Sequence, residues 1–319
     1  MPKARGNPKS RDRRPLTVVV PAALVVVAIF AVAALSGDEP EPARLVAAGD
    51  APFSLAASAD HLWVGNAGDL SVSRLDLATG EPTGDPIPLP VRPGQIAAGK
   101  QVWVGAIEGA DIVRIDTGDP GRPPVPIAVG RDPAALALDG SEVWVAALNE
   151  GLIVRVSSDG EITDEITELG FPSALAMLGS DLWAADVTEG TVSRIDAGVG
   201  EVVETIEVGS GPTALAAGEG RLWVTLFRQD GVAALNPDDG GIEIVELEGA
   251  PGSVAVGGGY VWVTVPERDS LVRVDPTSLE AADPIPVGDN PQGVVVAGGA
   301  VWVANQGEDT VARIDLDSE

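Results

Sequence analysis

Acidic residues recur along this chain at positions from which carboxylates could bind a cation or act as acids and bases. Seven of them stand 39 to 42 residues apart: Asp69, Glu108, Glu150, Glu189, Asp230, Asp269 and Glu308. These are our candidate ligand-binding residues, and Asp50, Asp132 and Asp289 are expected to add carboxylates to the same surface. Gathered carboxylates repel one another, and a divalent cation such as calcium, which favours several oxygen ligands, would relieve that repulsion.

The alternative to a metal site is a solvated acidic rim. No EF-hand or other metal motif occurs in these segments. Arg92, Arg228 and Arg268 are expected on the same surface and would neutralise part of its charge. The sequence therefore names no certain cofactor, and calcium is a hypothesis resting on the acidic residues alone.

Residue types that commonly carry catalysis are scarce. The 319 residues include no cysteine, one histidine and one tyrosine. This excludes disulfides, thiolate metal sites and cysteine catalysis, and it leaves imidazole catalysis almost nothing to use. We interpret His61 as a solvated loop residue on the surface opposite the acids, and we assign no catalytic residue.

Three further repeats run in step with the acids and indicate the elements that hold them. The tryptophans stand 39 to 41 residues apart: Trp63, Trp103, Trp144, Trp183, Trp223, Trp262 and Trp302. A proline precedes each by ten or eleven residues: Pro52, Pro93, Pro133, Pro172, Pro212, Pro251 and Pro291. Eleven residues after each tryptophan stand Arg74, Arg114, Arg155, Arg194, Ala234, Arg273 and Arg313. Coupled repeats of this period indicate a repeat architecture.

Each repeat reads as four short β-rich runs bounded by Gly, Asp, Asn and Pro, which is typical of one propeller blade. We therefore predict an all-β, seven-bladed β-propeller of four-stranded antiparallel blades over residues 44–319. The tryptophans are expected to pack between neighbouring blades, and each arginine to lie opposite its tryptophan and cover the ring. Asp76 and its counterparts are expected to cap the turn that follows them.

The two ends of the predicted domain complement each other. The last repeat stops after its third strand, whereas residues 44–49 match the segment that precedes Pro291. We predict that this N-terminal strand completes blade seven and closes the ring, so that no open edge remains.

A membrane anchor is predicted ahead of the propeller. Residues 1–14 carry a net charge of +5 and are followed by 23 uncharged residues, 15–37, long enough to cross a bilayer. The basic side stays cytoplasmic, which makes 1–14 a cytoplasmic segment, 15–37 a transmembrane signal-anchor helix and 38–43 a linker, with the propeller outside the cytoplasm. A cleaved signal peptide is the alternative, although the apolar stretch is long for one.

Charge limits the partners. The whole chain has a formal charge of −28, so the residues after the basic segment carry −33. Such a domain is repelled by phosphate backbones, and we expect no nucleic acid partner. The expected partners are the membrane, through the N-terminal helix, and an unidentified small molecule or protein.

The repeats also resemble a known family. The segments Trp63-Val-Gly-Asn66 and Trp302-Val-Ala-Asn305, with Ser71-Val-Ser-Arg-Leu-Asp76 and Thr310-Val-Ala-Arg-Ile-Asp315, resemble the YVTN-type propeller repeat. More loosely, the chain is similar to the streptogramin (virginiamycin B) lyases and to NHL-repeat propellers. The lyase resemblance implies a metal-dependent enzyme with a catalytic histidine, and the predicted loop surface offers none.

We therefore expect a non-catalytic binding or sensor module that acts through its acidic loops. One alternative is a metal-dependent lyase or hydrolase, which would need a cation held by acids of several blades. Another is a cell-envelope scaffold, which would need an apolar patch among the loops, hinted at by Phe227 and Pro266. Blade five lacks the arginine, having Ala234 in its place, and is our candidate for a specialised surface.

Overall fold

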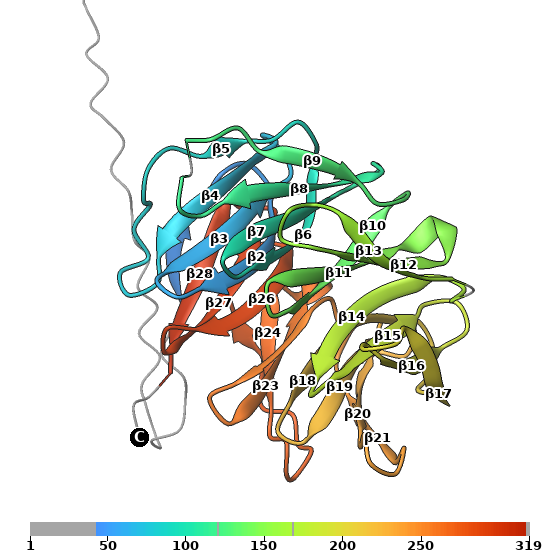
Figure 1. Ribbon diagram of the computed structural model, residues 1–319. Coiled ribbons are helices and arrows are strands. Elements are labelled where there is room, and N and C mark those ends of the chain that lie inside the picture. The colour runs from blue at the N-terminus through green and yellow to red at the C-terminus, as the bar shows by residue number, and fades with distance from the viewer. Residues whose placement is uncertain (1–42, 120, 168, 317–319) are drawn as a thin grey trace, which may run out of the picture. The chain divides into compact units, whose positions relative to one another are not determined.

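The chain folds into seven separate four-stranded antiparallel sheets, one for each repeat (Figure 1). The computed structural model describes residues 43–119, 121–167 and 169–316. The first strands of the repeats contact one another in cyclic order, and the first strand of the last repeat contacts that of the first. These strands therefore surround the central axis, and the predicted seven-bladed propeller is confirmed.

Each blade has four strands, arranged from the central axis outward. At each level, the strands follow in the order of blades 1 to 7. The innermost strands are β2 (Pro52–Ser58), β6 (Pro93–Ala98), β10 (Pro133–Asp139), β14 (Pro172–Leu178), β18 (Pro212–Gly218), β22 (Val254–Gly257) and β26 (Pro291–Ala297). The second strands are β3 (His61–Asn66), β7 (Gln101–Ala106), β11 (Glu142–Ala147), β15 (Asp181–Asp186), β19 (Arg221–Leu226), β23 (Tyr260–Val265) and β27 (Ala300–Asn305). The third strands are β4 (Ser71–Asp76), β8 (Asp111–Asp116), β12 (Leu152–Val156), β16 (Thr191–Asp196), β20 (Gly231–Leu235), β24 (Ser270–Val274) and β28 (Thr310–Asp315). The outermost strands are β5 (Ile87–Pro88), β9 (Val125–Ala128), β13 (Ile162–Ile166), β17 (Glu201–Glu207), β21 (Ile242–Glu246), β25 (Ile285–Pro286) and, in blade 7, β1 (Arg44–Ala47).

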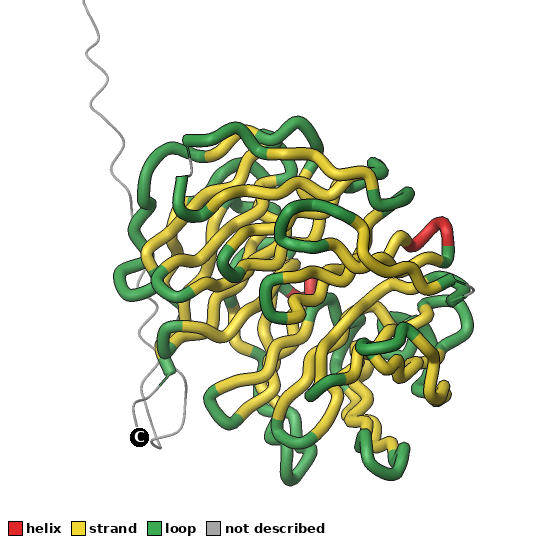
Figure 2. Tube along the Cα trace, in the orientation of Figure 1, coloured by secondary structure: helices red, strands yellow, loops and turns green. Residues whose placement is uncertain are grey.

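The domain has two kinds of surface. Turns after the second strands and the connections between blades lie on one side, which we call the loop face. Hairpins that join the first strand to the second, and the third to the fourth, lie on the opposite face. The two short 3-10 helices of the described residues, Leu148–Glu150 and Pro266–Arg268, are loop-face turns (Figure 2).

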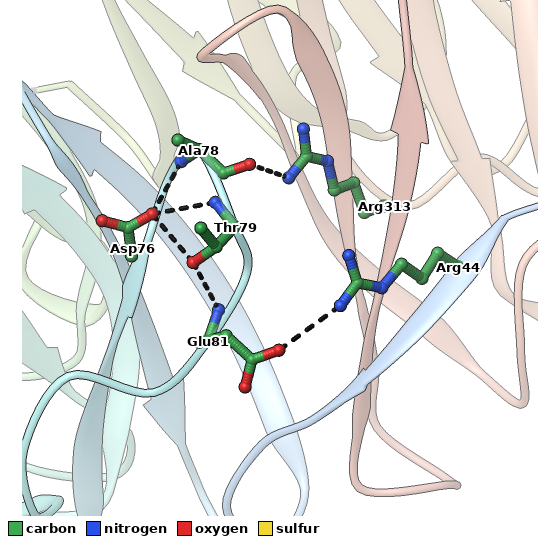
Figure 3. Close-up of polar contacts among 6 residues, drawn as sticks. All are labelled: Arg44, Asp76, Ala78, Thr79, Glu81 and Arg313. Atoms are coloured by element: carbon green, nitrogen blue, oxygen red, sulfur yellow. Dashed lines mark hydrogen bonds and ion pairs between the residues drawn. The ribbon is translucent and has the colours of Figure 1, made fainter.

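Blade 7 is completed by the N-terminal strand, as predicted. Strand β1 pairs antiparallel with β28, with Arg44 opposite Arg313. Across the junction with blade 1, Arg44 lies 3.4 Å from Glu81 (Figure 3). The first and last strands of the domain thus share one sheet, which holds the ring closed.

The tryptophans fill the spaces between blades. All seven are at most 1% exposed, and each belongs to a core cluster that also contains residues of the next blade. The register confirms that each tryptophan lies opposite the residue eleven positions later, Trp63 opposite Arg74 for example. The guanidinium covers the indole in blades 1, 3, 4 and 7, whereas Arg273 of blade 6 stacks on Tyr260 instead.

The predicted turn caps are also present. Asp76 accepts hydrogen bonds from the backbone N–H groups of Ala78 and Thr79, at 3.1 and 2.8 Å, and from the Thr79 hydroxyl. The bonds from Thr79 are the main reason that the pKa of Asp76 lies below its ordinary value. Asp275 caps the equivalent turn of blade 6 through the N–H groups of Ser278 and Thr277, which likewise lower its pKa. These aspartates are turn formers, as expected.

The predicted cytoplasmic segment, anchor helix and most of the linker, residues 1–42, lie outside the described residues. Within residues 43–316, the described part contains no helix long and apolar enough to cross a membrane. The anchor therefore stays a prediction from the sequence.

Candidate functional site

The seven candidate acids do occupy the loop-face turns, but several of them bond to the nearby backbone. Asp69 accepts a 3.2 Å hydrogen bond from the N–H of Asp50 and a 2.6 Å bond from the Ser71 hydroxyl. Glu150 accepts from the N–H of Arg131 at 3.1 Å and pairs with its side chain at 3.5 Å. These carboxylates hold the connection from the preceding blade in place.

Similar contacts occur in other blades with other residue types, but those of Asp269 and Asp309 reach the connection to the following blade. Asp269 accepts from the N–H of Asn290 at 3.0 Å. In blade 5 the acceptor is the amide of Gln229, and in blade 7 it is Asp309, one residue after the predicted Glu308. Glu108, Asp230 and Asp269 also have positive φ angles, which short turns require. At Asp69, Glu150 and Asp269 the acid therefore has a structural explanation.

The structure gives no support to the calcium hypothesis. Within the described ranges, no three His, Asp or Glu side chains come close enough together to hold a metal ion. Ca²⁺ usually takes six to eight oxygen ligands, several of them carboxylates. The acids of different blades are therefore not brought together as a metal site in this part of the chain.

A second set of polar residues, absent from the sequence predictions, lies buried beneath the loop face. The last residue of the second strand is Asn66 in blade 1, Asp186 in blade 4 and Asn305 in blade 7, and all three are at most 7% exposed. Asn66 donates to the hydroxyls of Ser71 and Ser73, and Asn305 to the carbonyl of Val287 and the hydroxyl of Thr310. They tie turns and connections to the strand below.

Asp186 is the charged member of this set. It accepts hydrogen bonds from the N–H groups of Phe171, Thr188 and Glu189, each 2.8 to 2.9 Å long, and from the Thr188 hydroxyl. Burial alone would raise the pKa of Asp186, but the bonds from Glu189, Phe171 and Thr188 outweigh it and lower the pKa. Because its oxygens are occupied by the protein, we interpret Asp186 as a structural residue.

A cavity of about 420 Å³ opens at the loop-face end of the central axis. Its floor comes from the starts of the innermost strands of five blades, and its wall from the turns of blades 5 and 6. The residues that line it are Phe53, Gln95, Thr213, Ala214, Phe227, Ala250, Pro251, Gly252, Ser253, Pro266, Glu267, Gln292 and Gly293. Phe227 and Pro266, the two apolar residues singled out from the sequence, are both among them.

The lining combines apolar surface with a few polar groups. Phe53, Phe227 and the prolines provide aromatic and aliphatic contact, and Phe227 is 52% exposed. Gln95 and Gln292 offer amides, and the Gln292 amide is positioned by donating to Asn290 at 2.8 Å. Among the lining residues, Glu267 carries the one formal charge. A mostly apolar concave site with a few placed polar groups is the usual form of a ligand pocket.

Most of this lining was missed from the sequence, although a signal was present. Phe53, Thr213 and Gln292 each directly follow a proline of the repeat that opens an innermost strand. Whereas the repeat keeps that proline, the next residue varies from blade to blade. Since innermost strands surround the axis, the variable position after the proline predicts which residues line its mouth.

The histidine lies away from this cavity. His61 is the first residue of β3, opposite Asp76 and 6.2 Å from the Trp63 ring, and it is half-buried on the opposite face. It is thus a strand residue, whereas we had predicted a loop residue, but its predicted position away from the loop face holds.

Comparison with known proteins supports the fold alone. No protein-family model and no curated protein matches the sequence. Among solved structures, the chain is similar to the virginiamycin B lyase of Staphylococcus aureus, with a TM-score of 0.76, 18% identity and coverage of 86% of this chain and 99% of that one. A streptogramin B lyase structure has a TM-score of 0.74 and 17% identity, with coverage of 86% of this chain and 98% of that one. Hydrazine synthase of Kuenenia stuttgartiensis has a TM-score of 0.72 and 19% identity, with coverage of 84% and 96%. The chain thus shares a seven-bladed propeller fold with the lyases, and at such identities the similarity does not extend to activity.

Proposed function

We propose that this protein is a non-catalytic binding module, anchored in the cell membrane with its propeller outside the cytoplasm. Its ligand binds in the axial cavity of the loop face. The observation that carries the proposal is the cavity itself, where two phenylalanines and two glutamines from different blades converge. At the position after the repeat proline, several blades have small residues such as Gly94 and Ala134, whereas blades 1 and 7 have Phe53 and Gln292. The shared structure of the blades does not require these larger side chains.

The lining also indicates the class of ligand. Glu267 lies in the wall, no Lys or Arg does, and the loop face around it is rich in carboxylates. An anion would be repelled, whereas a neutral or cationic molecule with an apolar group can pack on Phe53 and Phe227. Gln95 and Gln292 can then donate to or accept from its polar atoms.

Three small probes test this assignment on the full chain in detergent micelles: benzylamine, benzyl alcohol and benzoate. We expect saturable binding of benzylamine and weaker binding of benzyl alcohol by saturation-transfer NMR, and none of benzoate. Phe227→Ala should weaken benzylamine binding at least fivefold. Leu70→Ala removes another exposed apolar side chain of the loop face, 42% exposed and outside the cavity, and should leave binding unchanged. Binding of benzoate as strong as that of benzylamine would contradict the proposal.

The fold similarity supports a second candidate, a lyase. One similar structure is a catalytically inactive His-to-Ala variant of the S. aureus virginiamycin B lyase with quinupristin, with a TM-score of 0.75 and 17% identity. The cavity of the present chain is lined by no histidine. We expect virginiamycin B incubated with the full chain and magnesium to keep its mass and ring, as measured by mass spectrometry and NMR. Ring opening would establish the lyase instead.

A third candidate, an envelope scaffold with a protein partner, is favoured by the exposure of Phe171, 44% exposed on the same face. Phe171 does not line the cavity. Phe171→Ala therefore separates the two readings. A small ligand in the cavity would bind this variant as before, whereas a protein covering the face would bind it more weakly.

The membrane anchor is tested by fractionation. The full chain should sediment with membranes and resist extraction by high salt, while a chain starting at residue 38 and expressed without a signal should stay in the supernatant. Protease added to intact spheroplasts should digest the propeller, since the basic segment holds the N-terminus in the cytoplasm. A propeller protected until lysis would contradict the proposed orientation.

A further inference from the structure

The arginine of blade 2 is held differently from its counterparts in the next two blades. In blade 3, Nε of Arg155 lies 2.6 Å from the carboxylate of Glu142, and in blade 4, Nη2 of Arg194 lies 2.6 Å from that of Asp181. The bond and charge of Asp181 raise the pKa of Arg194. Glu142 and Asp181 are equivalent, each being the first residue of its second strand.

In blade 2 this position is an amide, Gln101. Its Nε2 donates to the carbonyl of Ser158 in blade 3 at 3.0 Å, and Nη1 of Arg114 donates to the same carbonyl at 2.5 Å. Oε1 of Gln101 is buried and receives no hydrogen bond. Among the described residues, no ion pair of 4.0 Å or less includes Arg114, whereas Arg155 and Arg194 each make two. One of the five N–H donors of the Arg114 guanidinium bonds to Ser158, and none has an acidic partner there.

Two adjoining cavities, of about 290 and 150 Å³, lie at this point between blades 2 and 3 on the opposite face. They share Gln101, Asp116 and Ser158. Arg114 lines the smaller cavity, and Trp103 with Lys100 lines the larger. In four other blades an arginine covers the tryptophan ring, but Arg114 and Trp103, both in the described part, do not stack. Trp103 forms part of the wall of the larger cavity, although its side chain is only 1% exposed.

The charges of the lining favour one negative charge. Lys100, Arg114 and Arg122 are the cations, and Asp116 and Asp159 are the acids, with Arg122 lying 3.9 Å from Asp116. The lining is thus net positive by one on a chain of formal charge −28, and Lys100 is the one lysine after residue 14. Opposite charges within a few ångströms stabilise each other, so an incoming carboxylate can replace the one that Gln101 lacks.

We propose that this cleft between blades 2 and 3 is a binding site for a small organic monocarboxylate. Its carboxylate lies on Arg114 and Lys100, where Glu142 lies on Arg155 in the neighbouring blade. Its apolar part packs on Leu138, which lines the larger cavity. The site is separate from the axial cavity, prefers the opposite charge and does not depend on the proposed function.

Phenylacetate is the probe, with the neutral phenylacetamide and sodium chloride at matched ionic strength as comparisons. We expect saturable binding of phenylacetate to the full chain in detergent micelles by isothermal titration, and no saturable binding of phenylacetamide. Gln101→Glu should lower the affinity for phenylacetate at least tenfold, because the new carboxylate forms an ion pair with Arg114 and competes with the ligand. The melting temperature of this variant should not fall. Asp181, the equivalent residue of blade 4, pairs with Arg194 in the way expected of the new glutamate, and it lies opposite Asp196 as Gln101 lies opposite Asp116. Arg114→Gln should also abolish binding.

The matched control is Gln306→Glu. It adds the same charge on the loop face, at an amide oxygen that already accepts a hydrogen bond from Asn290, and it should leave phenylacetate affinity unchanged. Absence of saturable binding to the unmodified chain overturns the proposal. So does equal affinity for the Gln101→Glu variant, or equal binding of phenylacetamide, because either result would show that the carboxylate does not bind Arg114.

Discussion

Arg313 of blade 7 donates a 2.6 Å hydrogen bond through Nη1 to the carbonyl oxygen of Ala78 in blade 1, 235 positions earlier in the chain (Figure 3). The same guanidinium covers the ring of Trp302, 5.0 Å away, and its Nε lies 2.7 Å from Asp315. Arg155 makes a similar bond from blade 3 to the carbonyl of Ala197 in blade 4. An arginine that covers its own tryptophan and bonds the turn of the next blade holds two blades together.

Replacing Arg313 should loosen the ring closure. Arg313→Ala removes a charged hydrogen bond and a cation–π contact from a side chain that is 12% exposed, and we expect a loss of about 1–2 kcal/mol. The melting temperature should fall by about 2–4 °C per kcal/mol in calorimetry. Arg44→Ala is the control, because the Arg44–Glu81 pair is more than half exposed and should contribute under about 0.5 kcal/mol. Equal losses in both variants would contradict this account.

Two tryptophans should respond differently to the same change. The indole N–H of Trp223 donates to the carbonyl of Gly218 at 3.2 Å, whereas that of Trp144 is buried without an acceptor. Both changes to Phe remove ring atoms, but Trp144→Phe also removes an unsatisfied donor. We expect Trp223→Phe to cost about 1 kcal/mol more in urea denaturation. A larger loss in Trp144→Phe would show that its N–H is satisfied in solution.

Asp186 should make the domain sensitive to acid. Its pKa is lowered in the folded state, so its contribution is present above the unfolded pKa of about 3.9 and is lost as pH falls through the folded value. Asp186→Asn should cost about 1–3 kcal/mol at pH 7. The difference in unfolding free energy between the two proteins should shrink steadily below about pH 4. A difference that stays constant down to pH 2 would show that the carboxylate charge contributes nothing.

Gly105 should tolerate no side chain. Gly105 lies in β7 of blade 2, close to the backbone of blade 3, and a Cβ there would clash with the carbonyl oxygen of Pro133. Because backbone must move to make room, Gly105→Ala should destabilise by about 1–3 kcal/mol. At Gly99 a Cβ would meet only a Leu138 methyl group at 3.4 Å, so Gly99→Ala should change the melting temperature little. An unchanged melting temperature for Gly105→Ala would mean that the blades separate more easily than their packing indicates.

Calcium should stabilise the protein no more than other salts do. Two of the candidate acids, Asp69 and Glu150, already accept backbone hydrogen bonds. We expect calcium, magnesium and sodium chloride at matched ionic strength to raise the melting temperature equally, by screening the charge of −33. A calcium-specific rise that Asp69→Asn abolishes would restore the metal hypothesis.

The architecture could be predicted from the sequence because each blade is a local unit. The tryptophan, its preceding proline and the arginine eleven residues later lie within one repeat, and the hairpins that place Trp63 opposite Arg74 are short. The closing strand could be predicted too, since residues 44–49 resemble the segment that the last repeat lacks.

The acids illustrate where this reasoning ends. Their recurrence predicts a cation site, yet Asp69, Glu150 and Asp269 instead accept hydrogen bonds from backbone N–H groups of the connections between blades. A sequence pattern shows that a position is constrained, but it does not show which atom the side chain contacts.

The axial cavity and the cleft at Arg114 were decided by the tertiary structure alone. Phe53, Thr213 and Gln292 are separated by 79 to 239 positions, and only closure of the ring places them around one axis. Arg114 follows the repeat in sequence, but its guanidinium donates to the carbonyl of Ser158 in blade 3 and does not cover the Trp103 ring, which the repeat alone does not indicate. Local periodicity determines which strands form, whereas the contacts at a site depend on side chains that distant segments bring together.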